Sequence, residues 1–169
     1  MRKAIIIFLA LLTTHIKAFS IDGVTISVGE SRDNIKIYRV GLRKDFKSRW
    51  LRSRIGYLSG YYEASLNYWD GKSGDNNFGV AFSPVFAYYL EFNDFKPFIE
   101  VGIGASYFKE SKIDGRDLST NFLFEDRIGL GARYKNFEIS FRFMHYSNAS
   151  IKEPNDGIDI WIGALSYKF

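Results

Sequence analysis

A histidine and a serine stand two residues apart where a row of large apolar side chains should continue. His145 and Ser147 lie in the segment FRFMHYSNAS, 141–150, in phase with the apolar row that begins at Phe137. Residues two apart in a strand share a face, with Cα atoms roughly 6.8 Å apart. Because an imidazole can activate a hydroxyl as a nucleophile, this spacing indicates covalent acyl-transfer chemistry.

A serine–histidine pair of this kind needs a carboxylate to hold the imidazole. Asp159 is in phase with Trp161 in the last alternating segment of the chain. If Phe143 pairs with Trp161 in an antiparallel ladder, the next pair in phase joins the histidine to this acid, with Cβ atoms about 5 Å apart. The pattern therefore allows a triad of His145, Ser147 and Asp159.

Two other interpretations fit the same residues. If the turn at 134–137 pairs its two flanking residues, Asp126 lies opposite His145 from the other neighbouring strand, which makes Asp126 the alternative acid. A histidine and a serine at a strand end near water are also common as polar side chains that only face solvent. In that case the residues do no chemistry.

The chain begins like a secreted protein. Arg2 and Lys3 precede an apolar run at 4–12, which is the order of a secretory signal and is too short to span a bilayer. Cleavage after Ser20 leaves small residues at the last and third-last positions and is preferred to cleavage after Ala18. The sequence therefore predicts a signal peptide at 1–20 and one domain at 21–169.

Composition excludes several classes of function. Losing residues 1–20 removes three of the 23 cations and none of the 19 acids, so the formal charge falls from +4 to +1 and nucleic-acid binding is not expected. The chain has no cysteine, and His145 is the one histidine after residue 20. Thiol nucleophiles, zinc–thiolate sites and multi-histidine metal sites are excluded, and we expect neither a metal nor an organic cofactor.

The rest of the chain alternates between apolar and polar residues in segments of about ten, separated by turn-forming residues. This pattern is typical of a closed antiparallel barrel. Pro84 falls inside one segment, where we expect a bulge or a local break. The eight expected strands cover residues 22–29, 34–43, 53–67, 76–90, 97–108, 120–134, 136–147 and 158–169.

The last segment, WIGALSYKF at 161–169, has aromatic residues at both ends of its apolar face, as in the aromatic girdles of outer-membrane barrels. The predicted fold is an all-β, eight-stranded antiparallel transmembrane β-barrel of the bacterial outer membrane, with its apolar face toward lipid. Eight strands leave a lumen that side chains fill. The residues expected to form an inward charged network are Glu100, Glu125, Arg127, Arg133, Glu138 and Arg142.

An even strand count places both termini on the periplasmic side and segments 68–76, 109–119 and 148–157 outside the cell. His145 and Ser147 are then at the extracellular rim. A basic cluster falls around a predicted periplasmic turn, either solvated or in contact with anionic phospholipid heads. Its members are Arg43, Lys44, Lys47, Arg49, Arg52 and Arg54.

Residues 143–159, FMHYSNASIKEPNDGID, resemble the signature of the lipid A 3-O-deacylases, the PagL family. In that signature a histidine, one residue and Ser-Asn-Ala lead to Pro-Asn-Asp-Gly and an acid. The resemblance implies an outer-membrane esterase that removes the acyl chain at position 3 of lipid A. It makes His145 the general base, Ser147 the nucleophile and Asp159 the orienting acid, although the family has a glutamate there.

The resemblance also implies an oxyanion hole from the Asn148 side chain and the Ser150 amide, where the family has a glycine whose conformation a serine must reproduce. Acyl chains of lipid A would lie on the outer wall near Phe141, Phe143 and Trp161. The alternatives are a non-catalytic structural or adhesin-like barrel and an acyltransferase that passes a chain between lipids.

Overall fold

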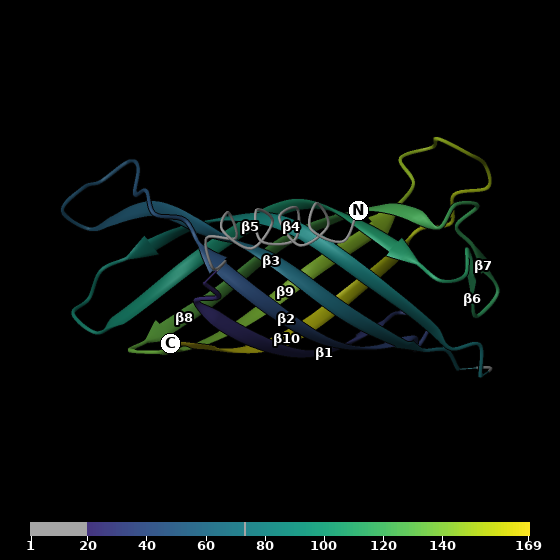
Figure 1. Ribbon diagram of the computed structural model, residues 1–169, viewed down its shortest axis with the longest axis horizontal. Coiled ribbons are helices and arrows are strands. Elements are labelled where there is room, and N and C mark those ends of the chain that lie inside the picture. Colours follow the sequence, from purple (N-terminus) through teal and green to yellow (C-terminus); the bar gives the residue numbers. More distant parts are fainter. Residues whose placement is uncertain (1–19, 73) are drawn as a thin grey trace, which may run out of the picture.

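The computed structural model describes residues 20–169 except 73, so the predicted signal peptide lies outside the described residues apart from Ser20. Eight antiparallel strands close into a barrel in the order β1-β10-β9-β8-β5-β4-β3-β2, which confirms the predicted fold (Figure 1). The strands are β1 (Gly23–Ser31), β2 (Lys36–Asp45), β3 (Gly56–Asp70), β4 (Asn77–Leu90), β5 (Phe95–Phe108), β8 (Phe122–Tyr134), β9 (Phe137–Ser147) and β10 (Ile158–Lys168).

One element was not expected from the sequence. Two short strands, β6 (Lys112–Ile113) and β7 (Arg116–Asp117), form a hairpin of their own in the long connection between β5 and β8. No helix in the described part of the chain has the length and hydropathy needed to cross a membrane.

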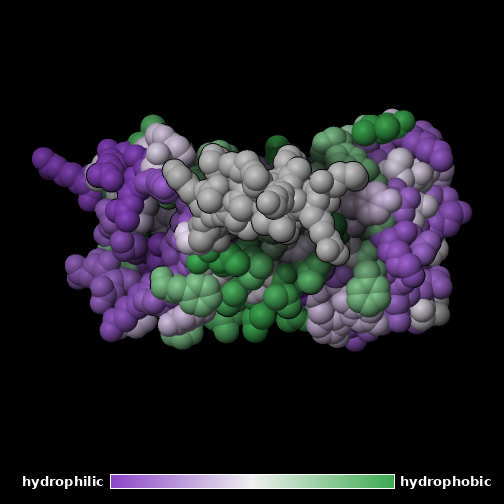
Figure 2. Space-filling model, in the orientation of Figure 1, coloured by the Kyte–Doolittle hydropathy of each residue, from purple (hydrophilic) through white to green (hydrophobic). Residues whose placement is uncertain are grey.

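Alternation along each strand divides the residues between an outer wall and a lumen. Ile103, Leu130 and Ile139 are 68%, 66% and 65% exposed, whereas Glu63 and Glu125 are fully buried. Figure 2 shows the consequence, a hydrophobic band across the middle of the visible face between two hydrophilic ends. Such a belt suits hydrocarbon, and the apolar face therefore points outward as predicted.

Ion pairs fill the lumen. Arg39 lies 2.8 Å from Glu63 and 2.6 Å from Glu125, and Arg127 lies 2.7 Å from Glu125. A buried charge is tolerated only when it is paired, and each of these guanidinium and carboxylate groups has a partner of opposite charge. All six predicted lumen residues take part, since Arg142 pairs with Glu100, and both Arg133 and Arg43 pair with Glu138.

Pro84 produces a break and no bulge. Pairing between β4 and β5 stops after Phe82↔Ala105 and resumes at Val85↔Gly102 without a change of register. Proline has no N–H to donate, so the ladder loses a bond without gaining a residue. Gly104 lies opposite this break. A Cβ built on it would lie only 2.0 Å from the Ser83 hydroxyl oxygen, which is closer than van der Waals contact allows.

The connections divide between two rims. One rim carries segments 32–35, 71–76, 109–121 and 148–157, and the other carries both ends of the described chain, Ser20 and Phe169, with segments 46–55, 91–94 and 135–136. In Figure 1 the β6–β7 hairpin and the yellow 148–157 segment lie at the right-hand end, and the blue 46–55 segment lies at the left. We call these ends the hairpin rim and the terminal rim.

Candidate active site

Strands β9 and β10 bring a histidine and an acid together on the outer wall at the hairpin rim. The ladder pairs Phe143 with Trp161 and His145 with Asp159, as the phase of the two segments predicts. His145 Nδ1 lies 2.7 Å from Asp159 Oδ1, within hydrogen-bond distance. The two side chains are 41% and 52% exposed. A carboxylate at Nδ1 fixes the imidazole and leaves Nε2 for a reacting group.

Asp126 also lies where the sequence places it. On β8 it pairs directly with His145 from the side opposite to Asp159, and it is half-buried. Among the described residues, no hydrogen bond joins Asp126 to the imidazole, whereas Asp159 has one. The histidine therefore has two acidic neighbours and contacts one of them.

Ser147 is the last residue of β9 and is half-buried beside the histidine. Both side chains border Gly157. A Cβ built there would lie 3.2 Å from His145 Cε1 and 3.8 Å from Ser147 Cβ. Within the described part of the chain the hydrogen bonds do not include one between Ser147 Oγ and the imidazole. Nucleophile–base contacts are often loose before substrate binds, so the arrangement suits an activated serine.

A tight turn follows the serine. The Ile151 N–H donates to the Asn148 carbonyl at 3.1 Å, and the two residues between them have positive φ, 52° at Ala149 and 59° at Ser150. Positive φ at both central residues is the mark of a type I′ turn, which favours glycine and asparagine. Ser150 therefore adopts a backbone conformation that glycine prefers. The left-handed backbone conformation costs an alanine or a serine about 1–2 kcal/mol of conformational free energy, and such strain is common at functional sites.

Asn148 lies differently from the expectation for an oxyanion donor. Its side chain is fully buried, and Nδ2 donates to the carbonyls of Leu118 and Lys152, both at 2.8 Å. Both amide hydrogens are therefore used within the protein. The Asn148 backbone N–H donates to Asn155 Oδ1 at 3.1 Å, which fixes the side chain of a second asparagine that the sequence did not single out.

Arg116 is a further residue that the sequence did not indicate. From β7, its guanidinium pairs with Asp33 and donates to the carbonyls of Asp156 and Gly157 at 3.1 and 2.8 Å. The hairpin adds the Asp117 N–H, which donates to the Asp156 carboxylate at 2.7 Å. The backbone against which His145 packs is therefore held by a residue from a different loop.

The charge of Asp117 also depends on the hairpin. A hydrogen bond from Lys112 on β6, with the two groups 2.9 Å apart, lowers the pKa of the Asp117 carboxyl, and the Ser119 N–H adds to the effect. Both side chains are outside the strands that form the barrel wall.

No cluster of three or more acidic, histidine or cysteine side chains in the described residues could hold a metal ion.

The predicted groove residues form one aromatic group beside the acid. The Trp161 ring stacks on Phe141, with centroids 5.3 Å apart and planes 8° apart, and contacts Phe143 at 5.0 Å. An apolar groove with a volume of about 770 Å³ extends from Phe141 along the outer wall. Part of its floor is Gly163, which pairs with Phe141 in the ladder and leaves the space above it open.

Known proteins resemble this chain in sequence and in fold. Residues 36–168 match the family described as Lipid A 3-O-deacylase (PagL). The chain is 37% identical over 161 residues to lipid A deacylase PagL of Pseudomonas aeruginosa, covering 94% of this chain and 92% of that protein. It is 41% identical over 73 residues to lipid A deacylase PagL of Bordetella bronchiseptica, covering 43% and 41%.

A crystal structure of the outer membrane enzyme PagL resembles this barrel with a TM-score of 0.84 and 36% identity, covering 87% of this chain and 99% of that one. Fold, sequence and length therefore agree over most of both proteins. The chain belongs to the lipid A 3-O-deacylase (PagL) family.

Proposed function

We propose that this outer-membrane enzyme hydrolyses the ester-linked acyl chain at position 3 of lipid A with a Ser147–His145–Asp159 triad on the outer wall. The observation that carries the proposal is the 2.7 Å contact between His145 Nδ1 and Asp159, with Ser147 two residues from the histidine. Phe141, on the same strand as the histidine, lines an apolar groove. The hairpin rim then faces the cell exterior, where lipid A resides.

Each step has an assigned group. His145 Nε2 takes the proton of Ser147 Oγ as the oxygen bonds to the ester carbonyl carbon. The carbon–oxygen bond of the ester breaks, and the imidazolium gives its proton to the sugar oxygen that leaves. Water then hydrolyses the acyl-serine with His145 as base again, releasing a fatty acid. Asp159 remains ionised throughout and stabilises the imidazolium.

The oxyanion would be held by the turn after the serine. The Ser150 amide lies in this exposed turn, and its positive φ reproduces the conformation that glycine prefers. For the second donor we place Asn155 where the sequence suggested Asn148. Asn155 Oδ1 is held by a backbone N–H, so its Nδ2 is the end of the amide that is available.

Replacing Asn155 by alanine is expected to lower kcat by about 10²-fold or more, the usual effect of losing an oxyanion donor. Replacing Asn148 by alanine removes the hydrogen bonds to the buried Leu118 carbonyl and to the Lys152 carbonyl, and should mainly lower stability, by about 1–3 kcal/mol for the buried carbonyl left unpaired. Turnover and thermal unfolding of both variants check this. A kcat loss with Asn148→Ala alone, at unchanged stability, would return the role to Asn148.

The substrate would stay in the membrane. Lipid A moves laterally until its ester reaches the rim, and its acyl chain lies along Phe141, Phe143 and Trp161 on the wall, because ion pairs fill the lumen. The bilayer supplies the rest of the apolar surroundings.

Mass spectrometry of lipid A incubated with the reconstituted barrel tests the function. We expect the mass of one hydroxyacyl group to be lost, with the site of loss at position 3. A non-catalytic or adhesin-like barrel would leave the lipid unchanged, and an acyltransferase would add a chain to an acceptor lipid. Either of those results would contradict the proposal.

Arg116→Ala is expected to lower kcat about tenfold with KM nearly unchanged, because the Asp156–Gly157 backbone no longer holds the imidazole in position. Arg116→Lys should restore part of the activity. Lys109→Ala, on the same segment and 72% exposed at its side chain, is the matched control and should behave as wild type. A rise in KM at constant kcat would instead assign Arg116 to substrate binding.

A further inference from the structure

The connection between β2 and β3 differs from the other connections at the terminal rim. Segments 91–94 and 135–136 are tight turns, whereas 46–55 is ten residues long, FKSRWLRSRI. Four of the ten are cations, four are large and apolar, and none is acidic. Barrels usually have short turns on the periplasmic side, so a long basic and apolar segment there needs an explanation.

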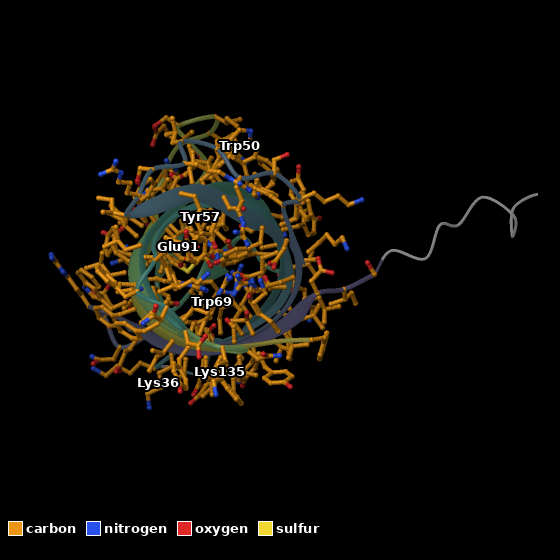
Figure 3. The ribbon with its side chains drawn as sticks, turned by 90° about the vertical axis from the view of Figure 1, so that its left-hand side faces the viewer. Lys36, Trp50, Tyr57, Trp69, Glu91 and Lys135 are labelled. Carbon is orange, nitrogen blue, oxygen red and sulfur yellow. The ribbon has the colours of Figure 1, made fainter. Side chains whose placement is uncertain are left out.

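The segment folds back onto the outer wall. Trp50 and Leu58 exchange two backbone hydrogen bonds of 2.8 Å, and a Ser53–Gly56 turn closes the loop. The Phe46 ring contacts Tyr62 and Phe86 on the wall, with centroids 4.8 and 5.3 Å apart. Figure 3 looks onto this rim and shows Trp50 outside the ring of strands and Tyr57 within it. The segment is therefore placed at the depth where the apolar belt ends.

Its apolar side chains point away from the protein core. Leu51 is 72% exposed, Ile55 63% and Trp50 43%. Exposing three large apolar side chains of one segment to water is unfavourable, so together they indicate an interaction site. Tryptophan beside aliphatic residues and arginines is the composition of segments that lie in the bilayer interface.

The cations of the segment remain available for a ligand. Two members of the predicted basic cluster do not belong to it, because Arg43 is buried against Glu138 and Lys44 pairs with Asp22. In the described part of the chain, none of Lys47, Arg49, Arg52 and Arg54 forms an ion pair. Arg49 lies over the Tyr57 ring, 4.3 Å from its centroid.

A cavity of about 230 Å³ lies between two of these cations. Arg49, Arg52 and Ser53 line it together with Gly56, Tyr57 and Glu91. The carboxylate of Glu91 is already paired with Lys96 at 3.1 Å, which reduces its repulsion of an anion. Two guanidinium groups beside exposed apolar side chains suit a phosphate whose acyl chains continue into the membrane.

We infer that segment 46–55 binds an anionic phospholipid, with the phosphate between Arg49 and Arg52 and the acyl chains against Trp50 and Leu51. The terminal rim faces the phospholipid leaflet if the proposed function is correct, because the catalytic rim then faces lipid A. Lipid binding itself is independent of catalysis. The site would anchor the barrel at the inner leaflet.

The test uses the whole barrel in zwitterionic detergent, titrated with phosphatidylglycerol or phosphatidylcholine and measured by native mass spectrometry. Wild type should bind phosphatidylglycerol at least tenfold more tightly than phosphatidylcholine. R49Q/R52Q should weaken phosphatidylglycerol binding about 25-fold, since each arginine near an anionic surface contributes about fivefold. K36Q/K72Q, which removes two exposed cations at the hairpin rim, should bind within twofold of wild type.

Three results would overturn the inference: equal binding of the two lipids, unchanged binding by R49Q/R52Q, or an equal loss in K36Q/K72Q. Displacement of phosphatidylglycerol by the same concentration of glycerol phosphate would also do so, because it would show a free-phosphate site. Deacylation by R49Q/R52Q should match wild type in the lipid A assay. Failure of lipid binding and failure of the proposed function are therefore seen in separate measurements.

Discussion

Ser147→Ala is expected to reduce lipid A deacylation by at least about 10⁴-fold while the barrel still folds. Removing the nucleophile of a serine triad leaves only the oxyanion donors and binding to assist water. The Ser147 side chain is half-buried and its hydroxyl has no hydrogen bond to another described residue, so removing that hydroxyl should cost little stability. Product formation by mass spectrometry and electrophoretic mobility of the unheated barrel measure the two effects.

Ser111→Ala is the matched control for this loss. Ser111 is a half-buried serine in the connection at the same rim, outside the proposed machinery. It should keep full activity. If Ser147→Ala retained more than about a tenth of wild-type turnover, another nucleophile would have to carry the reaction.

Asp159→Asn is expected to lower kcat by about 10³–10⁴-fold with a smaller change in KM. An amide at this position can hold the wrong tautomer of His145 and cannot stabilise the imidazolium. Asp126→Asn, on the other strand beside the histidine, should change kcat by less than tenfold, because no hydrogen bond joins Asp126 to the imidazole in the described residues.

The pair of variants is informative because both acids face the same ring at the same register. Kinetics on lipid A with each purified variant decide between them. A large loss with Asp126→Asn and activity retained in Asp159→Asn would reverse the assignment. Losses of equal size would mean that both charges stabilise the imidazolium.

Much of the wall and the centre of the site followed from alternation. A strand has a period of two, so fixing one pair, Phe143 with Trp161, fixes the partner of His145 as well. In the same way, the tight turn at 135–136 fixed the pairing of Asp126 with His145. These predictions held because a one-residue slip would move every apolar side chain of the strand into the lumen.

The loops did not follow from the sequence, because their contacts join segments far apart in the chain without any period. Asn148 donates to Leu118, thirty residues away, and Arg116 reaches Gly157 across forty-one. Nothing in the local sequence of either residue indicates its partner. Arg43 was grouped with a basic turn by proximity, although its phase with Arg39 placed it in the lumen.

The ion pairs between Arg39, Glu63, Glu125 and Arg127 lie across the lumen with buried side chains, an arrangement that opposes the passage of hydrated solutes. A bacterium could therefore carry many copies of this enzyme and remodel its surface without admitting antibiotics or losing nutrients by leakage.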